Sequence, residues 1–429
     1  MREGEYMFPF SAIVGQEDAK LALMISSVDS SIGGVLLSGV KGTGKSTLVR
    51  AFANVLPEID VSAGCPYHCD PKKPDSMCSQ CKEKHRAGKI EVAKMKPRVV
   101  SVPLGTTEDR LLGTIDVQKI LADGEVSFRQ GLIAKANRQI LYIDEVNLLP
   151  DNLTDDILDV AVSGVNRVER EGISIEHPAR FVLVGTMNPE EGQLRPQILD
   201  RFAISVKIDT ITDPDLRVEI INRALSYSLD SERFCREFAK LDKKLAEQIA
   251  DARDNLHNIK ISKKLINTVA LAMSRLGVDG QRPDIVIVKS AIALASLWGD
   301  KKVELKHIKK VSPMAVCHRT RNGGFDEPPS AEDVSKYIDG AYKEISGSSD
   351  SAEFTLQQIQ ERVLESAINA ILMTQNDSKK KRLELFLRAV PLEDSEIDLR
   401  FIAMCRRRIF SSFKIFLNRF LSRNKFRKK

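Results

Sequence analysis

The stretch GVKGTGKS, residues 39–46, decides the fold of this chain. It follows the apolar run Gly33–Leu37 and precedes the helical pattern Thr47–Phe52, so the local order is strand, loop, helix. The glycines of the loop permit the unusual backbone angles and the close approach that turn successive N–H groups toward a polyphosphate. The first turn of the following helix adds partial positive charge. The sequence therefore predicts a phosphate-binding loop in a doubly wound α/β fold with a parallel sheet.

Two side chains at the end of this loop have expected roles. Lys45 is expected to contact the β- and γ-phosphates as a point charge, and the hydroxyl of Ser46 is expected to bind the Mg²⁺ ion that bridges them. A glycine-rich turn without a ligand is the alternative. The strand before the loop and the helix after it favour phosphate binding.

Two further strands end in polar side chains at the same expected edge of the sheet. Ile140–Glu145 runs from apolar residues into two acids, at the carboxyl end of a buried strand, where open α/β sheets place their ligands. We expect Asp144 to hold Mg²⁺ through water, and Glu145 to act as the general base on a water aligned with the γ-phosphate. A third strand, Arg180–Thr186, brings the amide of Asn188 to this edge, where it can hold the attacking water.

Composition bounds the class of protein. The chain has 429 residues, of which 42% are hydrophobic and 29% charged, as in a soluble globular protein of two or three domains. It contains no run of about 18 uncharged apolar residues, and Met1–Glu5 lacks the features of a signal peptide, so we expect a cytoplasmic protein. The net charge of +6 comes from the tail, because ten Lys and Arg residues and no acid occur from Cys405 onward. The rest carries 55 bases and 59 acids, a balance of −4 that argues against nucleic-acid binding.

The sequence also resembles the ATPase subunit I of magnesium chelatase, an AAA+ family. The resemblance runs from about Phe8 to Pro329 and is carried by Phe8–Gln16, GTGKST at 42–47, LYIDEVNLL at 141–149, residues 163–202 and HRTRNGG at 318–324. Within the loop motif, the expected nucleotide-binding residues are Gly39, Gly42, Thr43, Gly44, Lys45, Ser46 and Thr47.

This resemblance implies a P-loop AAA+ module with a helical lid, which binds ATP and Mg²⁺. It implies self-assembly into a ring, usually a hexamer, with ATP at the subunit boundaries. Two partners are implied as well: a second AAA+ subunit with an integrin-type domain, and a large porphyrin-binding subunit that inserts Mg²⁺ into protoporphyrin IX.

The resemblance also assigns two arginines. Arg201 matches the arginine finger, a guanidinium that reaches the γ-phosphate on the neighbouring subunit. Arg282 matches the second sensor arginine, and Pro283 suits the first turn of a helix whose start would aim Arg282 at the nucleotide. The alternative for either arginine is a solvated or ion-paired side chain.

Between the phosphate loop and the acidic strand the chain is longer than a bare ATPase core requires. Leu111–Asp116, Gly124–Phe128 and Gly131–Ala134 predict strand pieces flanking a short helix, which resembles the insertion of the chelatase branch. A second hairpin is expected at Val168–Ser174. In related rings such hairpins line the pore or contact partners, so we expect this face to transmit the nucleotide state to partner subunits.

Four cysteines, with His68 and His85 nearby, lie within seventeen residues: Cys65, Cys69, Cys78 and Cys81. A structural zinc ion held by four thiolates is one interpretation. Their spacing is less typical than two CxxC pairs, and reduced free thiols or a redox switch are the other interpretations. Stable disulfides are not expected in a cytosolic chain.

After Asp209 the pattern becomes helical, with apolar residues at helical spacing such as Ile285, Val288 and Ile292. Asp213 and Pro214 predict the start of a helix. The polar run Ser346–Ser351 indicates a linker. We therefore assign residues 1–212 to the nucleotide-binding core, 213–330 to a helical lid, 331–352 to a linker and 353–429 to a helical appendage.

The last stretch, residues 405–429, is basic and amphipathic, with a stripe of aromatic and aliphatic side chains. Such a helix can lie on an acidic membrane surface, bind an acidic partner or touch nucleic acid. It can equally pack its aromatic stripe on a neighbouring helix and leave its charges in solvent.

The leading interpretation is the ATP-hydrolysing motor of a chelatase that inserts Mg²⁺ into protoporphyrin IX on another subunit. In a variant, the motor serves cobalt insertion in corrinoid synthesis, because the inserted metal never visits these residues. A MoxR-like AAA+ chaperone that remodels a protein partner is an alternative. Finding a client protein that does not handle porphyrin would favour it. A helicase or replication ATPase is another, favoured by stimulation of hydrolysis by DNA.

Overall fold

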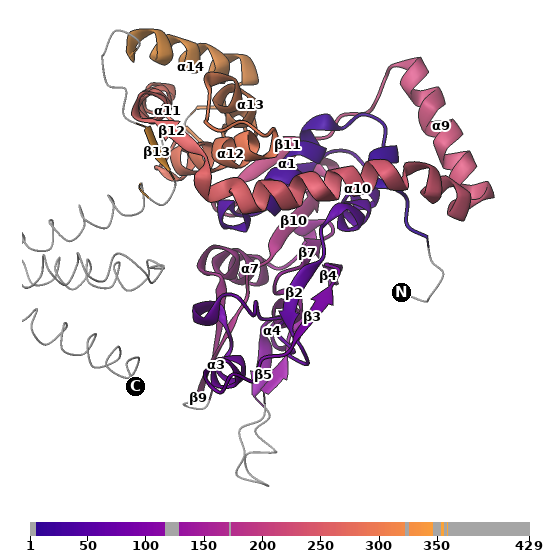
Figure 1. The fold of residues 1–429 in the computed structure, drawn as a ribbon. Coiled ribbons are helices and arrows are strands. Elements are labelled where there is room, and N and C mark those ends of the chain that lie inside the picture. Colours follow the sequence, from indigo (N-terminus) through magenta and orange to yellow (C-terminus); the bar gives the residue numbers. More distant parts are fainter. Residues whose placement is uncertain are drawn as a thin grey trace, which may run out of the picture. The chain divides into compact units, whose positions relative to one another are not determined.

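The computed structural model describes residues 6–115, 128–170, 173–321, 326–345, 353–355 and 358 (Figure 1). The chain divides into two compact units, Met1–Phe354 and Thr355–Lys429, and nearly all described residues belong to the first. Three predicted features fall almost entirely outside the described residues: the strand piece Gly124–Phe128, the polar run Ser346–Ser351, and the helical appendage with its basic tail.

Five parallel strands form the central sheet, in the order β11, β1, β10, β7, β4. Their bounds are β1 Val35–Ser38, β4 Val99–Val102, β7 Ile140–Ile143, β10 Val182–Met187 and β11 Ile204–Lys207. The three central strands are short apolar runs that are almost wholly buried, as expected for a parallel sheet covered on both faces. The predicted α/β fold is confirmed.

Within the described residues, six helices pack around this sheet and close its core. Helix α1 packs against β1, β10 and β11, while α6 packs against β4 and β7. Side chains such as Leu36, Leu141 and Leu183 from the strands meet Leu153 and Ile157 of α7 in one buried cluster. The core helices are α1 Glu17–Val28, α2 Lys45–Phe52, α4 Glu108–Leu112, α6 Leu132–Ala136, α7 Asp151–Ser163 and α8 Pro196–Leu199.

Three antiparallel strand pairs extend the core, and Figure 1 shows α3, β5 and β9 gathered at one end of it. The pairs are β2 Ile59–Ser62 with β3 Val92–Met95, β5 Gly113–Ile115 with β6 Phe128–Gln130, and β8 Val165–Arg170 with β9 Ile173–Pro178. Helix α3, Ser79–Arg86, lies between β2 and β3 in the chain.

The predicted hairpins can be compared with these pairs. The hairpin expected at Val168–Ser174 is confirmed, with Val168 opposite Ile175. The strand piece expected in Leu111–Asp116 is confirmed at β5. The strand expected at Gly131–Ala134 is wrong, because Leu132–Ala136 forms α6, in keeping with the helix preference of Leu, Ala and Lys.

The region after the sheet is helical. Asp213 caps α9 by accepting a hydrogen bond from the backbone N–H of Asp215 at 2.9 Å, and Pro214 occupies the first helical position, as predicted. The helices are α9 Pro214–Leu229, α10 Ser231–Asn255, α11 Lys263–Leu276, α12 Arg282–Leu297, α13 Leu305–Val316 and α14 Ala331–Ile345, and Lys260–Ser262 (β12) pairs with Glu353–Thr355 (β13). Within the described ranges, no helix combines the length and apolar character needed to cross a bilayer.

The linker predicted at 331–352 begins too early. Residues 331–345 form α14, which packs against α11 and α13 and buries Val334, Ile338 and Ala341. The polar run that indicated a linker starts only at Ser346, and the fifteen residues before it carry an apolar stripe at helical spacing. The helical lid therefore extends to Ile345.

A buried arginine ties the lid to the core. The side chain of Arg319, just after α13, is fully buried and donates to the backbone oxygen of Asp200 at 2.8 Å and to its carboxylate at 2.5 Å. It also donates to the backbone oxygens of Phe202 and Ala315. Removing the partner of a buried charge, or the donor to buried carbonyl oxygens, lowers the stability of the folded state considerably. Arg319 therefore fixes the lid against the chain between α8 and β11.

Replacing Arg319 with Met should lower the free energy of unfolding by about 3 kcal/mol, because several carbonyl oxygens lose their donor together with the ion pair. Urea denaturation of the purified variant measures this. Arg275→Met is the matched control, since Arg275 forms an exposed pair with Glu344 and should change stability little. Equal stability of the two variants would contradict the role given to Arg319.

Candidate nucleotide-binding site

The phosphate loop joins β1 to α2, as predicted, and its glycines serve two different purposes. Gly42 and Gly44 have φ of 84° and 81°, a region that other residues rarely adopt. Gly39 has no room for a side chain, because a Cβ there would lie 2.3 Å from the backbone oxygen of Ile208. The loop therefore needs glycine for backbone angle at two positions and for close packing at the third.

Lys45, at the first position of α2, folds back over this loop. Its Nζ donates to the backbone oxygens of Gly39 at 2.5 Å and Val40 at 2.8 Å. The hydroxyl of Thr43 donates to the same Val40 oxygen at 2.9 Å. Partial burial lowers the pKa of Lys45, although nearby acids oppose this shift. The ammonium group thus sits within the loop whose N–H groups would face a polyphosphate, whereas Thr47 is exposed on α2.

The structure brings Ser46 and Asp144 together from distant parts of the sequence. The hydroxyl of Ser46 lies 3.3 Å and 3.4 Å from the two carboxylate oxygens of Asp144, which follows β7. The hydroxyl of Tyr142 and that of Thr186 also donate to this carboxylate, each at 2.7 Å. Burial acts to raise the pKa of Asp144, but these hydrogen bonds outweigh it and hold the pKa below its ordinary value. The carboxylate is therefore ionised and faces Ser46.

Tyr142 and Thr186 belong to the candidate site, and the sequence analysis did not single them out. Both side chains are fully buried, on neighbouring strands β7 and β10, and their hydroxyls are 3.3 Å apart. Buried hydroxyls in otherwise apolar strands need partners, and here the partner is Asp144. A polar residue inside a predicted apolar strand was the signal available in the sequence.

Glu145 and Asn188 lie just beyond the ends of β7 and β10, at the same edge of the sheet. Glu145 has φ of 54°, a strained angle for a residue with a side chain, and its backbone N–H donates to the Thr186 hydroxyl at 3.2 Å. Asn188 follows β10, is 5% exposed, and its side-chain oxygen accepts a hydrogen bond from the backbone N–H of Glu190. Strained backbone of this kind is concentrated at functional sites. The charges of Asp144 and Glu145 both act on Lys45, so these groups share one site.

Of the two arginines, Arg201 belongs to the core and Arg282 to the lid. Arg201, after α8, forms ion pairs with two carboxylates of α7, Asp155 at 3.1 Å and Asp159 at 2.8 Å. Arg282, the first residue of α12, donates to the backbone oxygen of Asp200 at 3.4 Å. Arg282 thus contacts Asp200, the residue that precedes Arg201, the candidate arginine finger.

The four cysteines are brought together, at the end of the core that holds α3. Cys69, Cys78 and Cys81 are buried, Cys65 is partly buried, and none forms a disulfide. Hydrogen bonds from the thiols of Cys69 and Cys78 hold the pKa of Cys65 well below its ordinary value, whereas burial raises the pKa of Cys81 to about 12. Neither histidine is part of the group of possible metal ligands that the described residues form here.

Comparison with known proteins identifies matching families. Residues 114–197 match the family model for magnesium chelatase, subunit ChlI, and residues 266–338 match that for an AAA lid domain. The second match reaches into α14, which agrees with a lid that continues beyond residue 330.

Curated relatives cover most of the chain. A magnesium-chelatase subunit ChlI homolog of Methanocaldococcus jannaschii is 46% identical over 324 residues, which is 76% of this chain and 88% of the relative. Magnesium-chelatase subunit ChlI of Mesostigma viride is 45% identical over 347 residues, 81% of this chain and 95% of the relative. The chloroplastic ChlI-2 of Arabidopsis thaliana is 47% identical over 325 residues, 76% of this chain and 78% of the relative.

Among solved structures, one similar chain comes from a cryo-EM-based model of the complex between subunits BchI and BchD of magnesium chelatase. The two sequences are 43% identical, and the match spans 78% of this chain and all of the other, with a TM-score of 0.45. The relatives extend the match well beyond the loop motif, over the core and the lid. The chain therefore belongs to the family of magnesium chelatase subunit I, the AAA+ ATPase component of that chelatase.

Proposed function

We propose that this chain is the ATP-hydrolysing motor of a metal chelatase, and that hydrolysis drives insertion of Mg²⁺ into protoporphyrin IX held by another subunit. The observation that carries the ATPase part is the approach of the Ser46 hydroxyl to the Asp144 carboxylate, at 3.3 Å, beside the ammonium group of Lys45. A hydroxyl, a carboxylate and a lysine at a glycine-rich loop are the groups that bind ATP with Mg²⁺.

The nucleotide and its metal would be held by residues of the loop and of β7. The N–H groups of residues 39–45 and the Lys45 ammonium bind the phosphates, and Ser46 binds the magnesium ion directly. Asp144 holds this ion through water. Oxygen ligands and retained waters suit Mg²⁺, and the ionised state of Asp144 supplies the negative charge it needs.

Hydrolysis requires an activated water in line with the γ-phosphate. Glu145 is the proposed general base, since it directly follows Asp144 and its backbone is held in a strained position by Thr186. Asn188 is proposed to hold the water through its amide. Its place at the carboxyl end of β10, the strand between β1 and β7, supports this role.

Arg201 is proposed to act on the nucleotide of a neighbouring copy. Its partners within this chain are the carboxylates of Asp155 and Asp159, which are 44% and 73% exposed. Exposed ion pairs contribute little free energy, so the guanidinium can leave them at small cost when a phosphate is presented. Arg282 is proposed to sense the nucleotide from the lid, and its contact with Asp200 supports a link to Arg201. ATP at subunit boundaries then requires a ring, which we propose is a hexamer.

The partners follow from the family. The curated relatives are named as subunits of a chelatase, so the complete enzyme contains other chains. We propose that these are an AAA+ subunit with an integrin-type domain and a large subunit that binds the porphyrin. An assay of Mg²⁺ and Co²⁺ insertion with candidate partner subunits tests this: ATP-dependent insertion of Mg²⁺ supports it, and insertion of Co²⁺ alone overturns it.

Replacing Lys45 with Ala should weaken ATP binding about 10- to 100-fold, because the loop loses its charge-assisted contact with the phosphates. Equilibrium binding of a fluorescent ATP analogue measures this. Replacing Lys84, an exposed lysine of α3, provides the control and should leave binding unchanged. Equal affinities in the two variants would show that Lys45 does not contact the nucleotide.

Replacing Glu145 with Gln should retain ATP binding while hydrolysis falls about 10²- to 10⁴-fold, as expected for the loss of a general base. Phosphate release under saturating ATP measures hydrolysis. The control is Glu176→Gln, which alters only an exposed pair with Arg167 on the β8–β9 hairpin. Turnover of the Glu145 variant at the unmutated rate would refute the assignment.

Arg201→Ala should bind ATP but lose turnover about 10³-fold or more, because a finger stabilises charge in the transition state. Mixing this variant with Lys45→Ala subunits creates some subunit junctions in which one copy keeps Lys45 and its neighbour keeps Arg201. When the two variants are mixed in equal amounts, about a quarter of the junctions are of this kind. We expect hydrolysis to reappear in the mixture, measured against each variant alone. A mixture as inactive as its components would argue against a finger supplied by the neighbour.

A further inference from the structure

The four cysteines between β2 and β3 form a closed cluster that the nucleotide site does not use. Their sulfur atoms all lie within 4.8 Å of one another, and the Sγ atoms of Cys65 and Cys78 are 3.9 Å apart. Thiolates bound at about 2.3 Å to a tetrahedral Zn²⁺ stand about 3.8 Å apart, whereas a disulfide joins sulfurs at about 2.05 Å. We propose that these four cysteines bind one structural zinc ion.

The donor set fits a structural site. Four sulfur ligands fill a tetrahedral shell and leave no open position for a substrate, and soft thiolates select zinc over magnesium or calcium. The backbone N–H of Cys78 donates to the sulfur of Cys69 at 3.2 Å, an outer contact of the kind that orients metal ligands. Buried cysteines are common as small apolar residues, but apolar packing does not require four sulfurs from two separate segments to converge on one point.

The segment that carries the cysteines has only a small buried cluster of its own. Its own buried cluster consists of Cys69, Met77, Cys78 and Cys81, with Cys65, Tyr67 and Ile90 packed around it. Chain segments this short rarely bury enough apolar surface to be stable, and they depend on disulfides or metals. A zinc ion supplies the missing cross-link between the loop before α3 and the start of α3.

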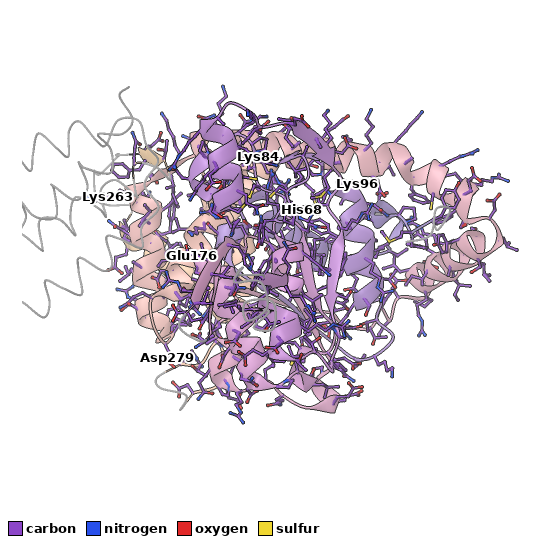
Figure 2. All side chains as sticks on the ribbon, turned by 90° about the horizontal axis from the view of Figure 1, so that it is seen from below. His68, Lys84, Lys96, Glu176, Lys263 and Asp279 are labelled. Carbon is purple, nitrogen blue, oxygen red and sulfur yellow. The ribbon has the colours of Figure 1, made fainter. Side chains whose placement is uncertain are left out.

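The charge of the segment matches this ion. Four thiolates around Zn²⁺ carry a net charge of −2. Residues 63–91 contain six Lys and Arg residues and four Asp and Glu residues, a balance of +2. The formal charge of the segment therefore balances that of the complex. In Figure 2, Lys84 marks α3 and His68 marks the loop between Cys65 and Cys69.

That loop supports the beginning of β7. The backbone oxygen of Tyr67 accepts a hydrogen bond from Asn137 at 2.5 Å, and Asp70 forms an ion pair with Arg138 at 3.3 Å. Both partners lie just before β7, the strand that Asp144 follows. An ion bound between the cysteines thus orders the loop on which the acidic strand rests.

The same loop reaches the β8–β9 hairpin. The ring of Tyr67 stacks on His177 of β9, with ring centres 4.9 Å apart and planes at 24°. His177 is buried and its Nε2 lies 2.9 Å from the amide nitrogen of Asn166 on β8. The zinc ion therefore braces two neighbours of its segment, the start of β7 and the base of this hairpin.

Elemental analysis of the full chain, purified under reducing conditions without added metal, tests the proposal. We expect about one zinc ion per chain. Cys69→Ser and Cys81→Ser should lose most of it, while Cys235→Ser should retain it. Cys235 is the matched control because it lies outside the cluster and donates to the backbone oxygen of Met7 at 3.2 Å, a bond that Ser can keep.

A second measurement does not depend on whether the variants fold. Exchange of the unmutated chain into Co²⁺ should produce the intense visible absorption of a tetrahedral four-thiolate site, at one equivalent. Removal of the metal by a strong chelator should make proteolysis within residues 63–91 several-fold faster. ATP binding is measured in parallel on the same samples.

Three results would overturn the zinc site. The first is folded, ATP-binding protein that holds almost no zinc and takes up none when it is offered. The second is a disulfide between any two of the four cysteines in freshly purified protein. The third is iron in place of zinc. None of these results bears on the proposed ATPase, because hydrolysis is measured separately.

Discussion

Neighbouring parallel strands of the sheet end in register, and the site is built from the residues that follow them. Ser38 lies opposite Met187, and Gly185 lies opposite Ile143. The chain therefore leaves β1, β10 and β7 at the same edge, where the phosphate loop, Asn188 and the two acids come next. Because side chains alternate between the faces of a sheet, a slip of one residue between β7 and β10 would carry the Tyr142 hydroxyl to the other face and away from the Thr186 hydroxyl.

Much of this edge could be predicted from the sequence because the signals are local. A glycine loop between an apolar run and a helix, and an acid that ends a buried strand, impose their backbone geometry on the residues beside them. Tyr142 and Thr186 could not be assigned in this way. Their role depends on the pairing of β7 with β10, and strand pairing is decided by the whole sheet rather than by either segment.

The helical lid was harder to predict, for a different physical reason. The spacing of Ile285, Val288 and Ile292 suggested one buried stripe, yet Ile285 is 56% exposed whereas Val286 and Ile287 are buried. Helix α12 is covered on several sides by α1, α10, α11 and α13, so its burial does not follow a single stripe. The lid–core contact between Arg319 and Asp200 joins residues 119 positions apart, and no local pattern marks it.

The packing of Gly39 against Ile208 has a mechanical consequence. Ile208 follows β11, which is the last of the five central strands along the chain, and the helical region begins soon afterwards at α9. The two backbones meet so closely that a single methyl group would not fit between them. The point at which the helical region leaves the sheet is thus immobilised against the wall of the phosphate loop. Any swing of that region pivots beside the phosphate loop, so a small displacement at the loop becomes a large arc at the far helices.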